Sequence, residues 1–154
     1  MTAPTGTALR ERLAPESLAA WRMFLRAHAH VMRKLEADLL REHGLPLASY
    51  DVLVQLVEAP DRRLRMTELA DRVLLSRSGL TRLIDRMQRE GLVDRAACES
   101  DARGLFACLT DAGLQRLRDA SPTHLRGVAD YALGRLTPAQ LAALADALGE
   151  LVHD

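Results

Sequence analysis

The feature that most constrains the fold lies between residues 74 and 95, in the stretch LLSRSGLTRLIDRMQREGLVDR. Its apolar side chains recur at steps of three and four residues, which predicts a helix with one buried face. Ser76 is a suitable N-cap for this helix, and Gly91 is a suitable stop. The helix, residues 76–90, must then lead directly into whatever follows Gly91. Its buried stripe is predicted to consist of Leu80, Leu83, Ile84 and Met87.

The other face of this helix carries hydroxyl and guanidinium groups. A solvated polar face is the ordinary interpretation of such a pattern. Here, however, a short predicted helix, MTELADRV with Thr67 as its N-cap, precedes it across a break of three or four residues. That is the layout of a helix-turn-helix, whose second helix enters the major groove. Arg, Ser and Thr side chains can contact base edges or phosphates there. The polar face consists of Ser78, Thr81, Arg82 and Asp85, flanked by Arg77 and Arg89.

Gly79 lies inside the predicted helix, where glycine costs about 1 kcal/mol of helix propensity relative to alanine. Two explanations stay open from the sequence. The glycine lets the backbone approach a phosphate closely, or it is required by local packing.

Residues 92–109 alternate around the loop signal ESDARG, which predicts two antiparallel strands. A hairpin beside a helix-turn-helix is a wing, and Arg103 near its tip can enter the minor groove. Asp101 is expected to pair with Arg103 or another arginine and so to structure the wing. Cys98 and Cys108 are predicted to lie near each other on the two strands, as small strand residues rather than as a redox pair.

The rest of the chain is predicted to be helical. A long helix starts at Pro15 and ends at Gly44, a second covers residues 46–59, and a connector with one short strand follows. A further long helix starts with Thr110 as N-cap and is expected to bend or break at Pro122. The last helix has Thr137 as N-cap. Residues 1–14 are expected to be disordered. The fold class is therefore mainly α, a winged helix-turn-helix with a small antiparallel β wing plus long terminal helices.

Composition excludes several classes of function. The formal net charge is zero, and residues 61–109, with 10 basic and 8 acidic side chains, are only weakly positive. The chain shows no apolar run of membrane-spanning length and no signal peptide, so we expect a cytoplasmic protein without membrane contact. It has no phosphate-binding loop, nucleophile elbow or dinucleotide motif, so we expect no enzyme. His and Cys spacing suggests no metal site and no cofactor.

The run ELADRVLLSRSGLTRLIDRMQREGLVDR, followed by SDARGLFACLTDAG, resembles the MarR family of winged-helix transcription regulators. The most specific mark is a D-x-R wing followed by L-T-x-x-G, present here as Asp101, Arg103, Leu109, Thr110 and Gly113. The resemblance covers residues 15–152. It implies a homodimer in which residues 15–45 and 110–154 form the dimerisation part and residues 46–109 form the DNA-binding part. The apolar stripes of the terminal helices independently favour a partner that covers them, and packing of these helices within one chain is the alternative.

The resemblance also implies a site. A dimer would read a pseudo-palindromic operator on double-stranded DNA, most often as a repressor. Thr67 and Ser76 are expected near the DNA backbone, and Arg65 and Arg86 are candidate phosphate contacts with a solvated role as the alternative. The DNA-binding set is Thr67, Ser76, Arg77, Ser78, Thr81, Arg82, Arg86 and Arg103.

Many members of the family bind a small aromatic or anionic effector between the dimerisation part and the winged helix. Trp21, His28, Tyr50 and Asp51 are the candidate lining residues here, and an ordinary packing role is the alternative for each. The alternative function is a winged-helix protein-interaction module without site-specific DNA binding. An exposed apolar recognition face would favour that alternative, and the sequence has Arg, Ser and Thr there instead.

Overall fold

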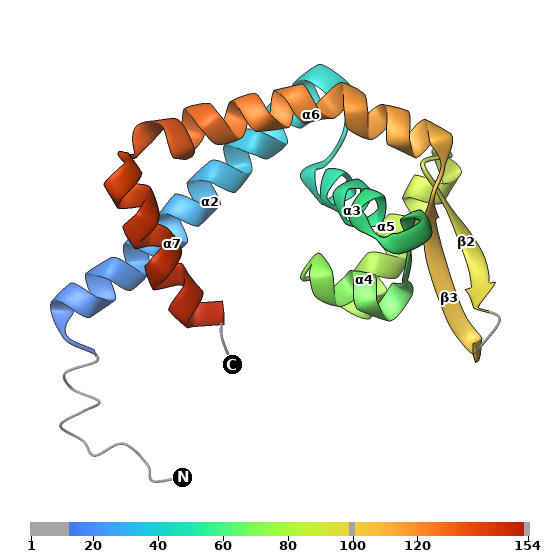
Figure 1. Ribbon diagram of the computed structural model, residues 1–154, viewed down its shortest axis with the longest axis horizontal. Coiled ribbons are helices and arrows are strands. Elements are labelled where there is room, and N and C mark those ends of the chain that lie inside the picture. The colour runs from blue at the N-terminus through green and yellow to red at the C-terminus, as the bar shows by residue number, and fades with distance from the viewer. Residues whose placement is uncertain (1–12, 99–100, 153–154) are drawn as a thin grey trace, which may run out of the picture.

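The computed structural model describes residues 13–98 and 101–152 and forms an arch (Figure 1). One end of the arch holds α2 and α7, the other holds α3, α4, α5 and the β-hairpin, and α6 runs across the top. This is the mainly α fold with a small antiparallel sheet that the sequence predicts. The expected disordered segment, residues 1–14, lies outside the described residues up to position 12. The elements are α2 (Pro15–His43), α3 (Leu47–Glu58), the 3₁₀ turn η1 (Pro60–Arg62), β1 (Arg63–Arg65), α4 (Met66–Arg72), α5 (Arg77–Arg89), β2 (Val93–Cys98), β3 (Asp101–Leu109), α6 (Asp111–Tyr131), the 3₁₀ turn η2 (Leu133–Arg135) and α7 (Pro138–Val152).

Helix α2 is buried only near its C-terminal end. Its buried side chains are Leu35, Asp38 and Leu39, and Gly44 ends it in the left-handed conformation, as predicted. The predicted apolar stripe continues toward the N-terminus but is exposed there. The Trp21 side chain, for example, is 54% exposed. The stripe is therefore a buried contact in its last turns and an uncovered apolar surface in its first ones.

The winged-helix part and the adjoining turns of α2 and α6 share one apolar core, in which α5 packs against α4 and β2. The strands are antiparallel in the order β1-β3-β2. Residues from all of these elements become fully buried, which fixes α5 by packing rather than by helix propensity alone. The most deeply buried members include Leu53, Leu56, Leu69, Leu80, Ile84, Met87 and Val93.

The strand register separates the two cysteines. Cys108 lies opposite Arg63 and Asp94, whereas Cys98 lies opposite Asp101 at the other end of β3. Along β2, Cys98 lies four residues beyond Asp94, the partner of Cys108, which at about 3.3 Å per residue places the two cysteines about 13 Å apart along the hairpin. The prediction that the cysteines lie near each other is therefore wrong, because strands of this length carry them to opposite ends. Burial raises the pKa of the Cys108 thiol.

The turn between α4 and α5 forms the expected tight break. Leu74 adopts a left-handed φ of 56°, and the Leu75 N–H donates to the Ala70 carbonyl at 3.1 Å, which closes α4. Leu74 is 90% exposed. The other end of α4 differs from the prediction: Arg65 occupies the N-cap position without a side-chain cap, and Thr67 lies inside the helix. Thr67 does not occupy the N-cap position, because β1 runs straight into α4.

Helix α6 starts beside the turn that joins α5 to β2. The Thr110 hydroxyl accepts from the Gly113 N–H at 2.9 Å and donates to the Gly91 carbonyl at 2.7 Å, so Thr110 is the predicted N-cap and also a tie to the preceding turn. A Cβ at Gly113 would lie 2.1 Å from the Leu92 carbonyl oxygen. Only glycine permits this approach. The helix then continues through Pro122 without the break that the sequence allows.

The crossing of α2 and α6 combines close packing with polar contacts. A Cβ at Gly127 would lie 2.6 Å from the Leu35 side chain, so the helices approach closely. Beside this contact the Tyr131 hydroxyl donates to buried Asp38 at 2.5 Å, which lowers the pKa of Asp38 and raises that of Tyr131. Glu42 accepts from Arg126 at 2.7 Å. The crossing is thus fixed at several successive turns.

Helix α7 is capped as predicted but makes little contact with the rest of its own chain. The Thr137 hydroxyl accepts from the Gln140 N–H at 3.3 Å, and the Gln140 side chain accepts from the Thr137 N–H at 2.9 Å. This reciprocal pair is a capping box. None of the residues of α7 that the structure describes is buried, although leucine and alanine dominate the helix.

Candidate nucleic-acid interface

The two faces of α5 are divided as the sequence predicts. Leu80, Ile84 and Met87 are buried, and Leu83 lies with them in the core. The predicted contact residues all lie on the exposed side. The packing of one face therefore holds the other face toward solvent, with no further support needed. The exposed predicted residues are Ser76, Arg77, Ser78, Thr81, Arg82 and Arg86.

The first turn of α5 is tightly organised around Ser76. Its hydroxyl accepts from the Gly79 N–H at 3.0 Å and lies 3.3 Å from the Ser78 hydroxyl. A Cβ at position 79 would lie only 3.0 Å from the same Ser76 oxygen. Of the two explanations for Gly79, local packing around the cap therefore has direct support. The N-terminus of this helix, with its partial positive charge, faces outward.

Thr81 uses its hydroxyl proton within the helix. The hydroxyl donates to the Arg77 carbonyl at 2.9 Å, one turn earlier. Its oxygen can still accept a hydrogen bond, and its methyl group is available for an apolar contact. In the major groove such a side chain suits a base amino group or a thymine methyl group.

Of three further predicted positions, two have structural contacts of their own and the third is exposed. The Arg86 guanidinium donates to the buried Ser49 hydroxyl at 3.4 Å, so it reaches back toward α3. The Arg65 guanidinium lies 5.6 Å from the centre of the Phe106 ring. Thr67 is exposed on the first turn of α4. Their role as backbone contacts stays a prediction.

The loop at the tip of the wing is shorter than predicted, because the strand after it starts earlier. Strand β3 already begins at Asp101, so residues 101–104, expected in the loop, belong to the strand instead. The side chains of Asp101 and Arg103 lie outside the described part of the structure, as do residues 99 and 100. The predicted Asp101–Arg103 pair and the wing contact of Arg103 therefore remain predictions.

One residue near the interface escaped the sequence analysis. Arg95 of β2 donates from its Nη1 atom to Asp85 at 2.6 Å and to Gln88 at 2.9 Å, and from Nη2 to the Thr81 carbonyl at 3.3 Å. It links the wing to α5. The only sequence signal was the presence of an acidic residue, Asp85, on a face otherwise suited to DNA.

The four candidate effector residues lie on two different helices, α2 and α3. Trp21 and His28 are exposed on α2, whereas buried Tyr50 stacks on His124 with ring centres 4.4 Å apart. Asp51 is exposed at the start of α3, and desolvation together with nearby Glu36 raises its pKa. Their role as lining residues is untested by this arrangement.

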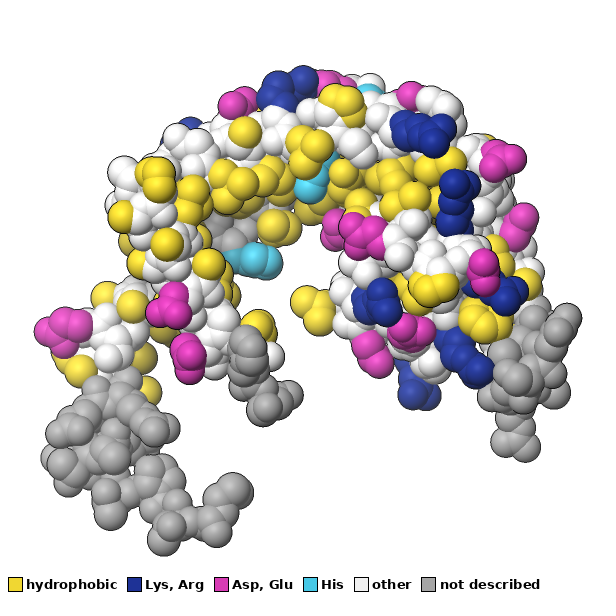
Figure 2. Space-filling model, in the orientation of Figure 1, with side chains coloured by type: hydrophobic (Ala, Val, Ile, Leu, Met, Phe, Trp, Pro, Cys, Tyr) yellow, Lys and Arg dark blue, Asp and Glu magenta, His cyan; other side chains and the backbone are white. Residues whose placement is uncertain are grey.

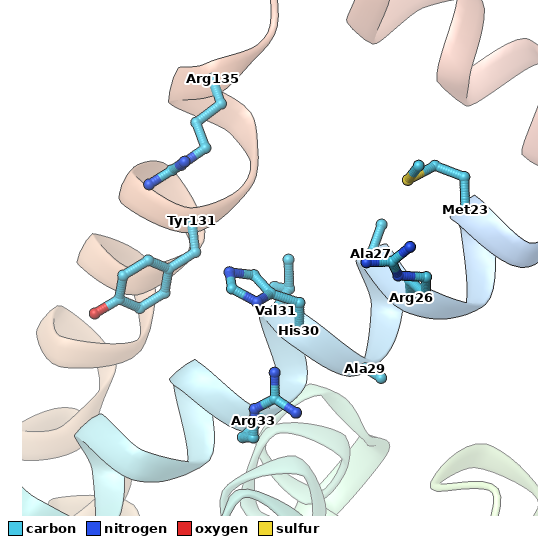
Figure 3. Close-up of a pocket in the computed structure, with 9 residues that line it drawn as sticks. All are labelled: Met23, Arg26, Ala27, Ala29, His30, Val31, Arg33, Tyr131 and Arg135. Carbon is cyan, nitrogen blue, oxygen red and sulfur yellow. The ribbon is translucent and has the colours of Figure 1, made fainter.

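A different hollow, which we call the α2–η2 groove, lies between α2 and the end of α6 (Figure 3). Its volume is about 500 Å³. Figure 3 shows the His30 ring directed from α2 toward Tyr131, with Arg26 and Arg33 on α2 and Arg135 on η2. The described residues that line the groove include no carboxylate. It is lined by Met23, Arg26, Ala27, Ala29, His30, Val31, Arg33, Tyr131 and Arg135.

Comparison with known proteins identifies the architecture. A model of the MarR family matches residues 43–104. AbsC, a MarR family transcriptional regulator from Streptomyces coelicolor, is 36% identical in sequence and superposes with a TM-score of 0.82 over 98% of this chain and 95% of its own. The chain belongs to the MarR family. The family consists of transcriptional regulators and not of enzymes.

Two further similar proteins extend the comparison. Sco3205 of Streptomyces coelicolor, solved in complex with DNA, is 39% identical with a TM-score of 0.84 over 88% of this chain and 85% of its own. The transcriptional repressor YetL of Bacillus subtilis is 35% identical over 95 residues, 62% of this chain and 54% of YetL. The chain thus spans little more than half the length of curated relatives of this kind.

No helix within residues 13–98 or 101–152 is long and apolar enough to cross a membrane. In the same residues, no group of three or more His, Cys, Asp and Glu side chains is placed to hold a metal ion.

The cap of α5 generates the first prediction. Ser76→Ala should lower the free energy of unfolding by about 1 kcal/mol, because the Gly79 N–H loses its acceptor. Gly79→Ala should bring little or no gain in the wild-type chain, since the new Cβ crowds the Ser76 oxygen. In the Ser76→Ala background the same change should stabilise by up to about 1 kcal/mol, the helix-propensity difference. Urea denaturation of the four chains measures this coupling. Equal effects of Gly79→Ala in both backgrounds would contradict the packing explanation.

Proposed function

We propose that this protein is a homodimeric, sequence-specific DNA-binding transcription regulator. The observation that carries the proposal is the exposed Arg, Ser and Thr face of α5, held outward by its buried face with the wing beside it. Figure 2 shows arginine side chains, interspersed with Asp and Glu, over the end of the arch that carries α4 and α5. In the proposed mode α5 enters the major groove, and the wing reaches the adjacent minor groove. The DNA complex of Sco3205 supports this assignment.

We assign dimerisation and DNA binding to different parts of the arch. Residues 15–45 and 110–154 form the proposed dimerisation part, and residues 46–109 form the proposed DNA-binding part. The support for dimerisation is the apolar surface on the first turns of α2 together with the unburied helix α7. Figure 2 shows hydrophobic side chains along the inner side of the arch. A second copy would cover this surface and present a second α5 for a pseudo-palindromic site with half-sites about 34 Å apart.

Repression is the proposed outcome of binding. A dimer on a site that overlaps a promoter blocks access by the polymerase. The repressor YetL provides the analogy. Transcription in vitro from a template carrying the preferred site over its promoter tests this point, and increased transcript on adding protein would contradict it.

The alternative, a winged-helix protein-interaction module, would need apolar side chains on the exposed face of α5. That face carries Arg77, Ser78 and Arg82 instead. Such a face suits phosphates and base edges better than an apolar protein surface.

The α2–η2 groove is the site at which we propose that a small effector acts. Arg26, Arg33 and Arg135 supply positive charge, and Tyr131 supplies an aromatic wall. An aromatic carboxylate matches both features. A ligand there touches α2 and the end of α6, and thus the dimerisation part. It would change DNA affinity if it favoured one spacing of the two recognition helices.

The recognition helix is tested by Arg82→Ala. Loss of a guanidinium that contacts a base edge should cost on the order of 1–3 kcal/mol of site-specific affinity. Selection of bound fragments from a random duplex pool at about 0.15 M salt, near physiological ionic strength, should enrich a pseudo-palindrome with the wild type and lose it with the variant. Arg118→Ala, which removes an exposed guanidinium from α6, is the matched control. Enrichment of no sequence by the wild type would favour the protein-interaction alternative.

The dimerisation surface is tested by Leu25→Asp. The carboxylate would have to be buried against the second copy, so the variant should sediment as a monomer at concentrations where the wild type is a dimer. Ala19→Asp places the same charge on the opposite, exposed side of α2 and should leave the dimer intact. Dimers of equal strength in all three proteins would show that this stripe is not the interface.

Effector binding is tested with benzoate as probe. Calorimetric titration should detect binding to the wild-type dimer and weaker binding to Arg26→Gln, which keeps a polar amide side chain but loses the positive charge. Benzoate should also alter the affinity for the selected duplex, and DNA should alter the affinity for benzoate by the same factor. If Arg26→Gln binds benzoate as tightly as the wild type, the groove is not the binding site.

A further inference from the structure

Arg95 connects the two elements that would read DNA. Its guanidinium holds Asp85 and Gln88 through one nitrogen and the Thr81 carbonyl through the other, at 2.6, 2.9 and 3.3 Å. These acceptors span two turns of α5, whereas Arg95 itself belongs to β2. One planar side chain therefore fixes the orientation of the wing relative to the exposed face of α5.

The strand register explains why Arg95 reaches this position. Side chains on one strand alternate between faces, so Arg95 lies on the same face of β2 as buried Val93. Its partner across the sheet is Ala107, which is fully buried and small. The long side chain passes over this alanine toward α5. The Arg95 side chain is only 21% exposed, in contrast to 49% for Asp85.

Asp85 would otherwise be unfavourable where it lies. It is exposed on the outer side of α5, one turn beyond Thr81 and Arg82, where a free carboxylate repels phosphates. A free carboxylate can also accept a hydrogen bond from the cytosine amino group and so change base preference. The ion pair with Arg95 neutralises the carboxylate and draws it toward the wing.

We propose that Arg95 is a positioning residue for DNA recognition with two effects: it sets the wing against the recognition helix, and it withdraws Asp85 from base contact. The inference rests on the proposed DNA-binding function and deepens it. Arg95 itself need not touch DNA. A lysine at this position could neutralise Asp85 but could not hold the same set of acceptors with a rigid planar group.

Three variants separate the two effects. Arg95→Gln removes the charge and the planar fork, Arg95→Lys keeps the charge only, and Arg95→Gln combined with Asp85→Asn removes both charges. Arg118→Gln is the control, because it removes one exposed guanidinium from α6 and leaves α5 and the wing unchanged. Fragment selection from a random duplex pool gives base preference. Hydroxyl-radical footprinting of the selected duplex gives wing contact in the minor groove.

Arg95→Gln should bind the wild-type site about tenfold more weakly, a loss of about 1.4 kcal/mol. It should lose minor-groove protection and shift base preference toward cytosine at one position in each half-site. Adding Asp85→Asn should remove the shift in preference but not restore the protection. Arg95→Lys should keep the preference with weakened protection, and it serves as the test if Arg95→Gln does not fold. Arg118→Gln should change neither readout.

The proposal is overturned if Arg95→Gln retains both the preference and the protection of the wild type. It is also overturned if Arg95→Gln and Arg118→Gln weaken binding equally with no change in footprint, because Arg95 would then act only through the net charge of the protein. A wild type that selects no sequence would instead contradict the proposed function itself, so the two failures are distinguishable.

Discussion

The structure depends on how closely α6 can approach its neighbours. Gly113 near its start lies against the Leu92 carbonyl, and Gly127, two thirds of the helix length later, lies against the Leu35 side chain of α2. A Cβ at position 113 would overlap a backbone carbonyl, and one at position 127 would overlap the end of the buried Leu35 side chain. The first contact locks α6 to the end of the recognition helix, and the second locks it to the dimerisation part. The geometry of the whole arch follows from these two contacts and from the Asp38 and Glu42 clusters that secure the second.

The recognition helix shows how burial and capping free a surface for other chemistry. Four apolar side chains and the Ser76 cap hold α5, so none of its stability has to come from the exposed Arg77, Ser78 and Arg82. One residue of the exposed face is nevertheless linked to another element. Asp85 belongs to the exposed face but is tied to Arg95, so the wing and the helix cannot be treated as separate readers.

Local patterns predicted most of this fold. The periodicity of α5, the caps at Ser76, Thr110 and Thr137, and the hairpin all follow from interactions within a few residues. The failures involve longer range. Thr67 is not a cap because β1 runs directly into α4, and the separation of Cys98 from Cys108 follows from the register. Arg95 was missed because its partners lie 7 to 14 residues away, across an interface that no spacing rule reveals.

Helix α6 also determines how a disturbance can travel through the molecule. It extends over 21 residues without interruption, about 31 Å at 1.5 Å per residue, and its two ends belong to different parts of the protein. A rod of that length converts a tilt of about 5° at one end into a shift of about 3 Å at the other. Pro122 has no backbone N–H, so one hydrogen bond is missing near the middle of α6. The helix should therefore bend most easily there, between its two glycine contacts. A small rearrangement beside η2 would therefore change the position of the wing but leave its internal structure unchanged.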